Sequence, residues 1–515
     1  MKTRIPMIIA AGVCGLVLTA PSGFSQGSLT PPPGPPGPTM KSLDQIEART
    51  PITSVPYTIS APGSYYLTGN LAVSSGTAIT IAANQVTLDL NGFTLSSTEA
   101  TPTGTGILLE VGGNSDITIR NGHITGGVTY SGGNYTGSGF ASGIFCYVPL
   151  NNVLVSGVSV SGCAHYGIYL FGNSTMVESC TVQTIGSYGI LANAVLRSTA
   201  SQCGGPAIVA NIASGCFGQA NGSSPALSAA TANNCYGQNT GIGDGVDATT
   251  ADNCYGLSTG SGYGLYASQT ATGCSGSSSS GYGLFASQTA TGCYGTSSSG
   301  NGLYANNAGN CNGQSFGGGT GLNAIQLATG CSGTSGSGTG LSANNAENCS
   351  GQSSSGTGLY ASQTATGCYG YSATGNGLSA NNAGNCSGQS GGGGNGLNAG
   401  LATACSGTSS SGNGLTASQT ANGCYGYSAS GTGLTATLVN NCVGQSNGGG
   451  YGISAGQIAT SSSGTSYSGT GLYAKYIVTA CGGFSTTGTT GLQAADATSS
   501  GGIPSYSVTY KYNMP

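Results

Sequence analysis

Residues 283–301 read GLFASQTATGCYGTSSSGN and residues 302–320 read GLYANNAGNCNGQSFGGGT, so a Gly-Leu-x-Ala motif returns after nineteen residues and a later cysteine after eighteen. The apolar member of this motif recurs at about the same step from Ile144 to Leu492. A short, constant period is typical of a solenoid, in which each coil buries its apolar face only against its neighbours. The repeat therefore predicts the architecture but not the function.

The residues around these motifs are typical of β-strands and turns. In Gly-Leu-x-Ala the Leu and Ala lie two apart, so both point inward while x points to solvent. Upstream, β-branched or aromatic runs such as Val86–Leu90 and Ile117–Ile119 alternate with Gly, Asn and Ser, without a helical period. We therefore predict an all-β, parallel β-helix solenoid of about twenty coils, roughly 95 Å long at the usual strand spacing.

The chain is expected to divide into five segments. Lys2 and Arg4 precede an apolar run from Ile5 to Ala20, which predicts a signal peptide over residues 1–25 and a secreted or cell-surface location. Residues 26–55 are expected to form a stiff Pro/Gly-rich linker and a short capping helix at Ser42–Arg49. Irregular coils then span residues 56–229, regular coils residues 230–500, and a capping strand residues 501–515.

The composition argues against two classes of function. Only 4% of the residues are charged, the formal net charge is −4, and there are 97 glycines and no Trp. A basic face for nucleic acid is therefore not expected. After the leader, no segment approaches the ~20 apolar residues that a membrane helix needs, and nothing indicates a cofactor.

Three N-terminal stretches carry a resemblance to a known group of proteins. They are ISAPGSYYLTGNL at residues 59–71, VTLDLNGFTL at 86–95 and ITIRNGHITGG at 117–127. Together they resemble the opening coils of bacterial secreted right-handed parallel β-helix proteins of the pectin-lyase-like superfamily, as an uncharacterised branch. The likeness covers roughly Lys41–Cys203 and continues only as coil periodicity. It implies the right-handed turn of the solenoid.

The resemblance does not extend to the catalytic residues of that superfamily. Polysaccharide lyases and hydrolases on this fold typically carry an Asp-rich calcium or acid/base cluster with a partnering Lys, Arg or His. This chain lacks adjacent aspartates and an R-x-K element, and Gly122-His123 is followed by Ile rather than Gly. The resemblance thus implies the fold without implying an activity.

The N-terminal coils contain one candidate set of charged residues. Aligning ITIRNGHI, VLVSGVSV, TMVESCTV and AVLRSTAS places Arg120, Ser156, Glu178 and Arg197 in one outward column, with His123 three residues beyond Arg120. If the chain is an enzyme, these charged side chains and His123 are the best candidates for its site. The favoured alternative is a surface ion pair between Glu178 and Arg197 on adjoining coils.

Three aspartates in one coil, Asp244, Asp247 and Asp252, form a weak candidate metal site. Their carboxylates could hold calcium. Solvated turn residues explain the same pattern equally well, so no metal ion is predicted.

An aromatic stripe is the candidate binding surface. Tyr266, Phe285 and Tyr304 are the x residues of three consecutive Gly-Leu-x-Ala motifs, and Tyr263 and Tyr282 precede two of them. Rings at coil spacing could stack on sugar rings. Alternatively, they stack on one another and shield the strands, which is the favoured interpretation.

The cysteine column allows three interpretations. Stacked, buried and unreactive thiols are favoured, since Ser462 replaces the cysteine in one coil. Disulfides between adjacent coils are the second, because an exported chain favours them. Metal binding is the third, and the least supported without a CxxC pair.

The second half of the chain offers many equal surfaces. SQTATGCYGYSATGNGLSA at Ser362 and SQTANGCYGYSASGTGLTA at Ser418 lie 56 residues apart, so a three-coil block is duplicated. This favours an exported structural or surface-interaction protein that contacts polysaccharide or cell-surface material, without catalysis. The alternative is a carbohydrate-active enzyme with a site in the N-terminal coils. A third hypothesis, ice or crystal-surface binding, rests on the recurrent threonines Thr270, Thr272, Thr289 and Thr291.

Overall fold

The structure, a computed structural model, describes residues 48–110 and 116–512. The expected signal peptide, the Pro/Gly-rich run and nearly all of the expected capping helix lie outside the described residues. From Arg49 onward the chain folds as one compact unit, and its first described strand is β1 (Thr50–Ile52).

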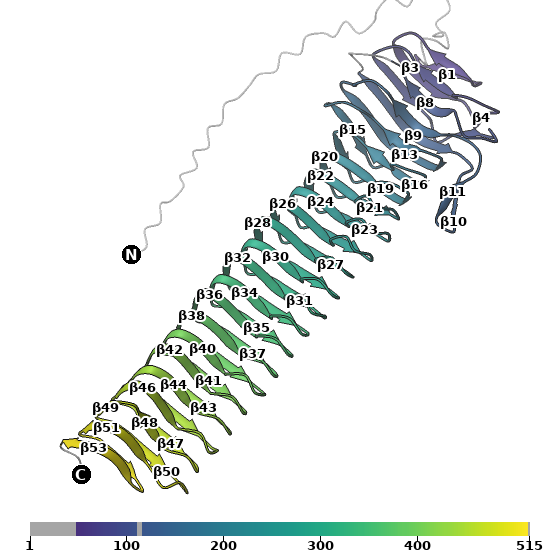
Figure 1. Ribbon diagram of the computed structural model, residues 1–515. Helices are drawn as coiled ribbons and strands as arrows, with labels where there is room; N and C mark the ends of the chain where they lie inside the picture. Colours follow the sequence, from purple (N-terminus) through teal and green to yellow (C-terminus); the bar gives the residue numbers. More distant parts are fainter. Residues whose placement is uncertain (1–47, 111–115, 513–515) are drawn as a thin grey trace, which may run out of the picture. The chain divides into compact units, whose positions relative to one another are not determined.

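The unit is an all-β solenoid of about 24 turns, which confirms the predicted fold class and roughly confirms the number of coils. Strands of successive coils pair in parallel, and Figure 1 shows the coils stacked one after another from β1 to β53. A short hairpin of β10 (Thr129–Ser131) and β11 (Asn134–Thr136) forms a separate antiparallel pair. In the described ranges, no helix is long and apolar enough to cross a membrane.

The candidate sites lie in two outward columns, one with Arg120 and Glu178 and the other with Phe145 and Tyr266, on strands of the N-terminal and central coils. Their bounds are β6 (Val86–Asp89), β9 (Ile117–Thr125), β12 (Ser142–Cys146), β13 (Val153–Cys163), β14 (Tyr166–Tyr169), β15 (Thr175–Glu178), β17 (Ile190–Leu191), β18 (Ala194–Leu196), β20 (Ile208–Ser214), β22 (Leu227–Asn233), β24 (Val246–Asp252), β26 (Leu265–Thr272), β28 (Leu284–Thr291) and β30 (Leu303–Gly309).

A regular coil has one long strand and one short strand. In β28 the side chains of Leu284, Ala286 and Ala290 are fully buried, while the residues between them face solvent to varying degrees. A turn then leads through Cys293 into the short strand β29 (Tyr294–Ser297). The inward Leu and Ala positions are those that the period-2 pattern predicted.

The turn between the two strands depends on a left-handed backbone conformation. The residue before the cysteine has a positive φ, 61° at Gly292 and 53° at Asn310. Glycine and asparagine adopt this conformation most readily. The recurrent Gly-Cys and Asn-Cys pairs are therefore the sequence signal of this corner.

The close approach of two glycine columns makes the coil narrow. A Cβ atom built on Gly295 would lie 2.2 Å from the carbonyl oxygen of Gly302, and one built on Gly302 would lie 2.2 Å from the backbone nitrogen of Gln314. The same contact recurs coil after coil. Glycine is thus required where the short strand meets the start of the next long strand.

A ladder of buried serines lies inside the short strands. Ser297 Oγ donates a hydrogen bond to the Gly281 carbonyl oxygen (2.7 Å) and accepts one from the Gly300 backbone N–H (2.8 Å). These contacts join neighbouring coils through groups that would otherwise be buried without partners. The ladder consists of Ser258, Ser278, Ser297, Ser315, Ser335, Ser353, Ser372, Ser390, Ser409, Ser428, Ser446, Ser466 and Ser485.

The C-terminal residues continue the solenoid. The described part of the segment expected to form a capping strand contains β52 (Gly501–Ile503) and β53 (Tyr506–Tyr512). β53 pairs in parallel with β51 (Leu492–Thr498), so it forms the last described rung of the same ladder.

Candidate ligand-binding face

Arg120 belongs to an ion-pair network that the sequence analysis did not identify. Its guanidinium lies 3.2 Å from Asp89 Oδ2, and Arg49 lies 3.7 Å from the same oxygen. Asp89, only 7% exposed, also accepts hydrogen bonds from the Asn91 backbone N–H (2.8 Å) and from Asn121 Nδ2 (3.3 Å). A buried carboxylate needs such partners. This network therefore has a structural role, and Asp89 in the VTLDLNG stretch was its sequence signal.

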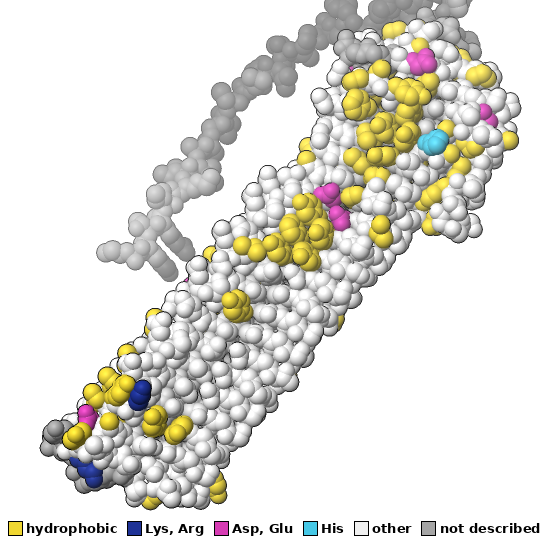
Figure 2. All heavy atoms as spheres, viewed as in Figure 1, with side chains coloured by type: hydrophobic (Ala, Val, Ile, Leu, Met, Phe, Trp, Pro, Cys, Tyr) yellow, Lys and Arg dark blue, Asp and Glu magenta, His cyan; other side chains and the backbone are white. Residues whose placement is uncertain are grey.

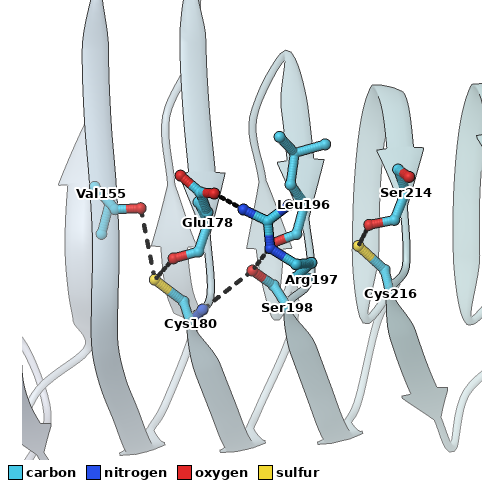
Figure 3. Close-up of polar contacts among 8 residues, drawn as sticks. All are labelled: Val155, Glu178, Cys180, Leu196, Arg197, Ser198, Ser214 and Cys216. Carbon is cyan, nitrogen blue, oxygen red and sulfur yellow. Dashed lines mark hydrogen bonds and ion pairs between the residues drawn. The ribbon is translucent and has the colours of Figure 1, made fainter.

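Glu178 and Arg197 form the ion pair that was expected between adjoining coils. Figure 3 shows their side chains pointing toward one another beside the cysteine ladder. The register differs from the sequence alignment, however, because Glu178 lies opposite Leu196. Arg197 instead occupies the left-handed turn position, with a φ of 47°. The alignment of Arg197 with the outward column was therefore wrong by one residue.

The four candidate catalytic residues do not meet at one point. Ser156 lies between Arg120 and Glu178 in the register, so the strands of these two residues are two coil steps, roughly 10 Å, apart. Arg120 is engaged by Asp89 and Glu178 by Arg197. His123 lies further along β9, opposite Ser159. The geometry thus divides the set into two ion pairs and a separate histidine.

The three aspartates also separate along their strand. Asp247 and Asp252 lie at opposite ends of β24, five residues or roughly 16 Å apart. Asp244 Oδ1 accepts a hydrogen bond from the Tyr263 backbone N–H (2.7 Å). Within the described residues, no group of three His, Cys, Asp or Glu side chains is placed to hold a metal ion.

Burial gives Asp244 unusual acid–base properties. The pKa of Asp244 is raised to about 6, chiefly by loss of hydration and to a smaller extent by the charge of Asp247, while the hydrogen bond from Tyr263 opposes the shift. Burial also raises the pKa of Asp247. The two carboxylates therefore form a partly shielded acidic pair at one end of the aromatic stripe.

The stripe of Tyr266, Phe285 and Tyr304 is continuous in the structure. The three residues lie in register on β26, β28 and β30. Their ring centroids are 5.2 and 4.9 Å apart, and neighbouring ring planes are nearly parallel, at 12° and 4°. Tyr263 and Tyr282 widen the stripe through further stacked contacts.

The ring spacing shows how the stripe is built. A ring is wider than the coil spacing, so parallel rings about 5 Å apart are stacked with an offset rather than laid flat side by side. The rings therefore contact one another, as the ladder interpretation expected. Each ring of Tyr266, Phe285 and Tyr304 is nevertheless only half-buried, so an outer surface remains for a ligand.

The same outward column carries a second aromatic group nearer the N-terminus. Register pairs link Phe145, Tyr169, Leu191, Val209, Ser228, Asp247 and Tyr266 in that order. Around Phe145 lie Tyr147, at 4.4 Å edge-on, and Tyr166, at 5.3 Å and stacked. Figure 2 shows two gatherings of hydrophobic side chains on one face, with acidic side chains beside the central one.

The cysteine column is a hydrogen-bonded ladder. Cys311 Sγ donates to the carbonyl oxygen of Ala290 or of Gly309 (3.3 Å each) and accepts from the Cys293 backbone N–H (3.4 Å). At Ser198, Ser462 and Ser500 a hydroxyl accepts from the preceding cysteine's N–H in the same way, at 3.0–3.1 Å. Figure 3 shows the start of this ladder at Cys180 and Ser198. The column therefore needs a small donor and acceptor, which serine also supplies.

The thiols are poorly placed for chemistry. Every cysteine in the described residues is buried and unpaired. Burial raises the pKa of Cys163 to about 12 and that of Cys180 to about 11. Because the thiolate is both the nucleophile and the metal ligand, these two thiols are chemically inert at neutral pH.

The threonine array that motivated the ice-binding hypothesis is short. Thr270 lies in register with Thr289, and Thr272 with Thr291. In the next coil the same two positions are Asn307 and Gly309. The flat threonine surface is therefore interrupted after a few coils.

Comparisons of this chain with protein families, curated proteins and solved structures found no match.

Proposed function

We propose that this chain is an exported surface-interaction protein that binds polysaccharide through the aromatic face of its solenoid and does not catalyse a reaction. One observation carries the proposal: aromatic rings recur at coil spacing in a single outward column of a chain with 4% charged residues. The outer parts of these half-buried rings offer sugars an apolar contact surface with little loss of side-chain freedom. The resemblance of the N-terminal coils to secreted β-helix proteins supports the same assignment.

The distribution of charges supports a binding role. Glycoside hydrolysis uses two carboxyl groups that flank the scissile bond. In the N-terminal coils, two of the carboxylates, those of Asp89 and Glu178, are held in ion pairs with arginines. A paired carboxylate is less available as an acid or a nucleophile.

Retention on insoluble polysaccharides tests the proposal. We expect the variant Tyr266→Ser/Phe285→Ser/Tyr304→Ser to lose roughly a hundredfold in affinity, at about 1 kcal/mol for each stacked ring. The matched control, Tyr294→Ser/Tyr369→Ser/Tyr425→Ser, removes three exposed tyrosines from short strands elsewhere on the coil. Unchanged retention of the first variant would remove the stripe from the function. A lost β-sheet circular-dichroism spectrum would show that the rings serve the fold.

The same preparation tests the enzymatic alternative. We expect no turnover of pectin, alginate or related glycans. Turnover that disappears in Arg120→Ala or His123→Ala would contradict a purely binding role and would place a catalytic site in the N-terminal coils.

A further inference from the structure

Two hollows in the N-terminal coils share Phe171 in their walls, and we call the two together the N-terminal groove. The first has a volume of about 370 Å³ and is lined by Phe145, Cys146, Tyr147, Tyr166, Tyr169 and Phe171. The second, of about 430 Å³, is also lined by Phe171 and includes Leu150, Asn193 and Asn211. Each volume lies within the range of about 300–1,000 Å³ that is usual for small-molecule sites.

The groove has aromatic walls at one end and carboxamides at the other. Tyr147 and Phe171 are 76% and 50% exposed, so their rings are open to a ligand. Asn211 Nδ2 donates a hydrogen bond to Asn193 Oδ1 (2.5 Å). This contact uses one N–H and one oxygen lone pair, so the two amides retain further donors and acceptors.

A buried hydroxyl holds the groove in shape. Thr175 is 1% exposed, and its Oγ1 donates to the carbonyl oxygens of Gly172 (3.3 Å) or Leu170 (3.4 Å). The same oxygen accepts a hydrogen bond from the Asn193 backbone N–H (2.8 Å). Thr175 therefore ties the turn that carries Phe171 to the start of the carboxamide end.

The turn at Phe171 also depends on a glycine. Gly172 has a φ of 146°, and a Cβ atom there would lie 2.2 Å from the Leu150 carbonyl oxygen. This close stacking allows the Phe171 carbonyl to accept a hydrogen bond from the Leu150 N–H (2.8 Å). The walls are thus set by the backbone and are in place before a ligand binds.

We infer that the N-terminal groove binds an uncharged glycan chain. This inference rests on the proposed function in one respect, the assignment of polysaccharide as the ligand. Aromatic rings and neutral amides match the faces and hydroxyls of a neutral sugar. None of the described residues that line the two hollows is Asp, Glu, His, Lys or Arg. A uronate carboxylate would therefore lose hydration there without gaining a charged partner.

The position of the groove supports a chain rather than a single sugar. The groove crosses the coils of Leu150, Leu170, Leu191 and Val209, a length of roughly 14 Å at the usual strand spacing. Continuing along the same column, the next charged residue is Asp247. A polyanion that followed the column would meet this carboxylate and that of Asp244, so the face selects against anionic glycans.

Titration calorimetry with soluble hexasaccharides tests the inference. The uncharged probes are hexasaccharides of β-1,4-glucan, β-1,4-mannan and β-1,4-xylan, and the anionic probe is hexagalacturonate. We expect at least one uncharged probe to bind, and Tyr147→Ser/Phe171→Ser to weaken that binding roughly 30-fold. Phe316→Ser, which removes an aromatic ring that is 64% exposed in a different turn, is the matched control and should leave the affinity unchanged.

A second variant tests the groove without removing a wall. Thr175→Val keeps the side-chain shape but loses the hydrogen bonds to the Phe171 turn and to Asn193. We expect roughly a tenfold loss of affinity with the circular-dichroism spectrum retained. The absence of binding by every uncharged probe, or equal affinities of the wild type and the groove variants, would overturn the inference. Tighter binding of hexagalacturonate would overturn the uncharged class of ligand.

The two proposals fail separately. If the Tyr266/Phe285/Tyr304 variant loses retention on insoluble polysaccharide while the groove variants bind hexasaccharides as the wild type does, the groove inference is wrong and the proposed function stands. If the groove variants lose the soluble probe but the stripe variant keeps its retention, the groove is a site and the stripe is not.

Discussion

Replacing Asp244 by asparagine should stabilise the protein at neutral pH. Asn has the same shape, and its Oδ1 can accept the hydrogen bond that Asp244 takes from the Tyr263 N–H. Asn301 already occupies this column two coils after Tyr263, and its Oδ1 accepts from the Thr320 N–H at 2.8 Å. The substitution therefore removes a buried charge and keeps its only described hydrogen bond.

The magnitude follows from the pKa of Asp244. A rise from 3.8 to about 6 corresponds to about 3 kcal/mol at pH 7 for a fully shielded group. Because Asp244 is only half-buried, we reduce this to about 1–2 kcal/mol. The folded state binds the proton more tightly than the unfolded state, so this destabilisation is absent below about pH 4. It grows as the pH rises toward 6 and is complete by pH 7.

Thermal unfolding at pH 3.5 and pH 7 measures the effect. We expect Asp244→Asn to raise the Tm by about 1–2 °C at pH 7 and to leave it unchanged at pH 3.5, since a chain of this size gains roughly 1 °C per kcal/mol. The reverse substitution, Asn301→Asp, should lower the Tm at pH 7 by a similar amount. Equal shifts of Asp244→Asn at both pH values, or a lower Tm at pH 7, would refute the burial argument.

Three further predictions concern the packing inside the solenoid. Thiol titration should find most of the eighteen described cysteines unreactive in the folded protein, and most of them free after denaturation without a reductant. Disulfides between successive rungs, detected by mass analysis, would contradict this. In the same column, Cys311→Ser should cost under about 1 kcal/mol, while Cys311→Val leaves the Cys293 N–H unpaired and should cost about 1–3 kcal/mol in denaturant unfolding. Gly295→Ala should lower the free energy of unfolding by at least about 3 kcal/mol, because the new Cβ would meet the Gly302 carbonyl oxygen. The control Gly309→Ala places its Cβ in open space and should change the free energy of unfolding by less than about 0.5 kcal/mol. Equal losses in the two variants would refute the close-approach argument.

The periodic half of the fold could be predicted because its inward residues are chemically distinct. Leu284, Ala286 and Cys293 are small or apolar, and each returns after about nineteen residues. The serine ladder was missed because Ser297 lies in a run of serines and glycines that is typical of a solvated loop. Its signal was the fixed distance of four residues from Cys293 to Ser297, which recurs in the neighbouring coils.

The candidate sites were harder to predict because they depend on turns rather than on the period. Arg197 was placed one residue out of register because the corner before Ser198 takes a left-handed residue, which in most other coils is Gly or Asn. The N-terminal groove depends on Gly172 and Thr175, two residues of an irregular coil that has no copy elsewhere. By contrast, the Glu178–Arg197 ion pair required only that the two residues lie on adjoining coils.

The narrow glycine corner also determines how such a chain can change during evolution. The contact between Gly295 and Gly302 involves only backbone atoms and repeats in every regular coil. Each regular coil therefore packs against the coil before it and the coil after it through nearly the same contacts. A whole coil, or the 56-residue block, can then be gained or lost without a new interface having to arise. The number of coils between Phe145 and Tyr304 fixes the distance between the N-terminal groove and the central stripe. Each coil gained or lost between the two surfaces therefore changes their separation by one coil spacing, roughly 4.8 Å.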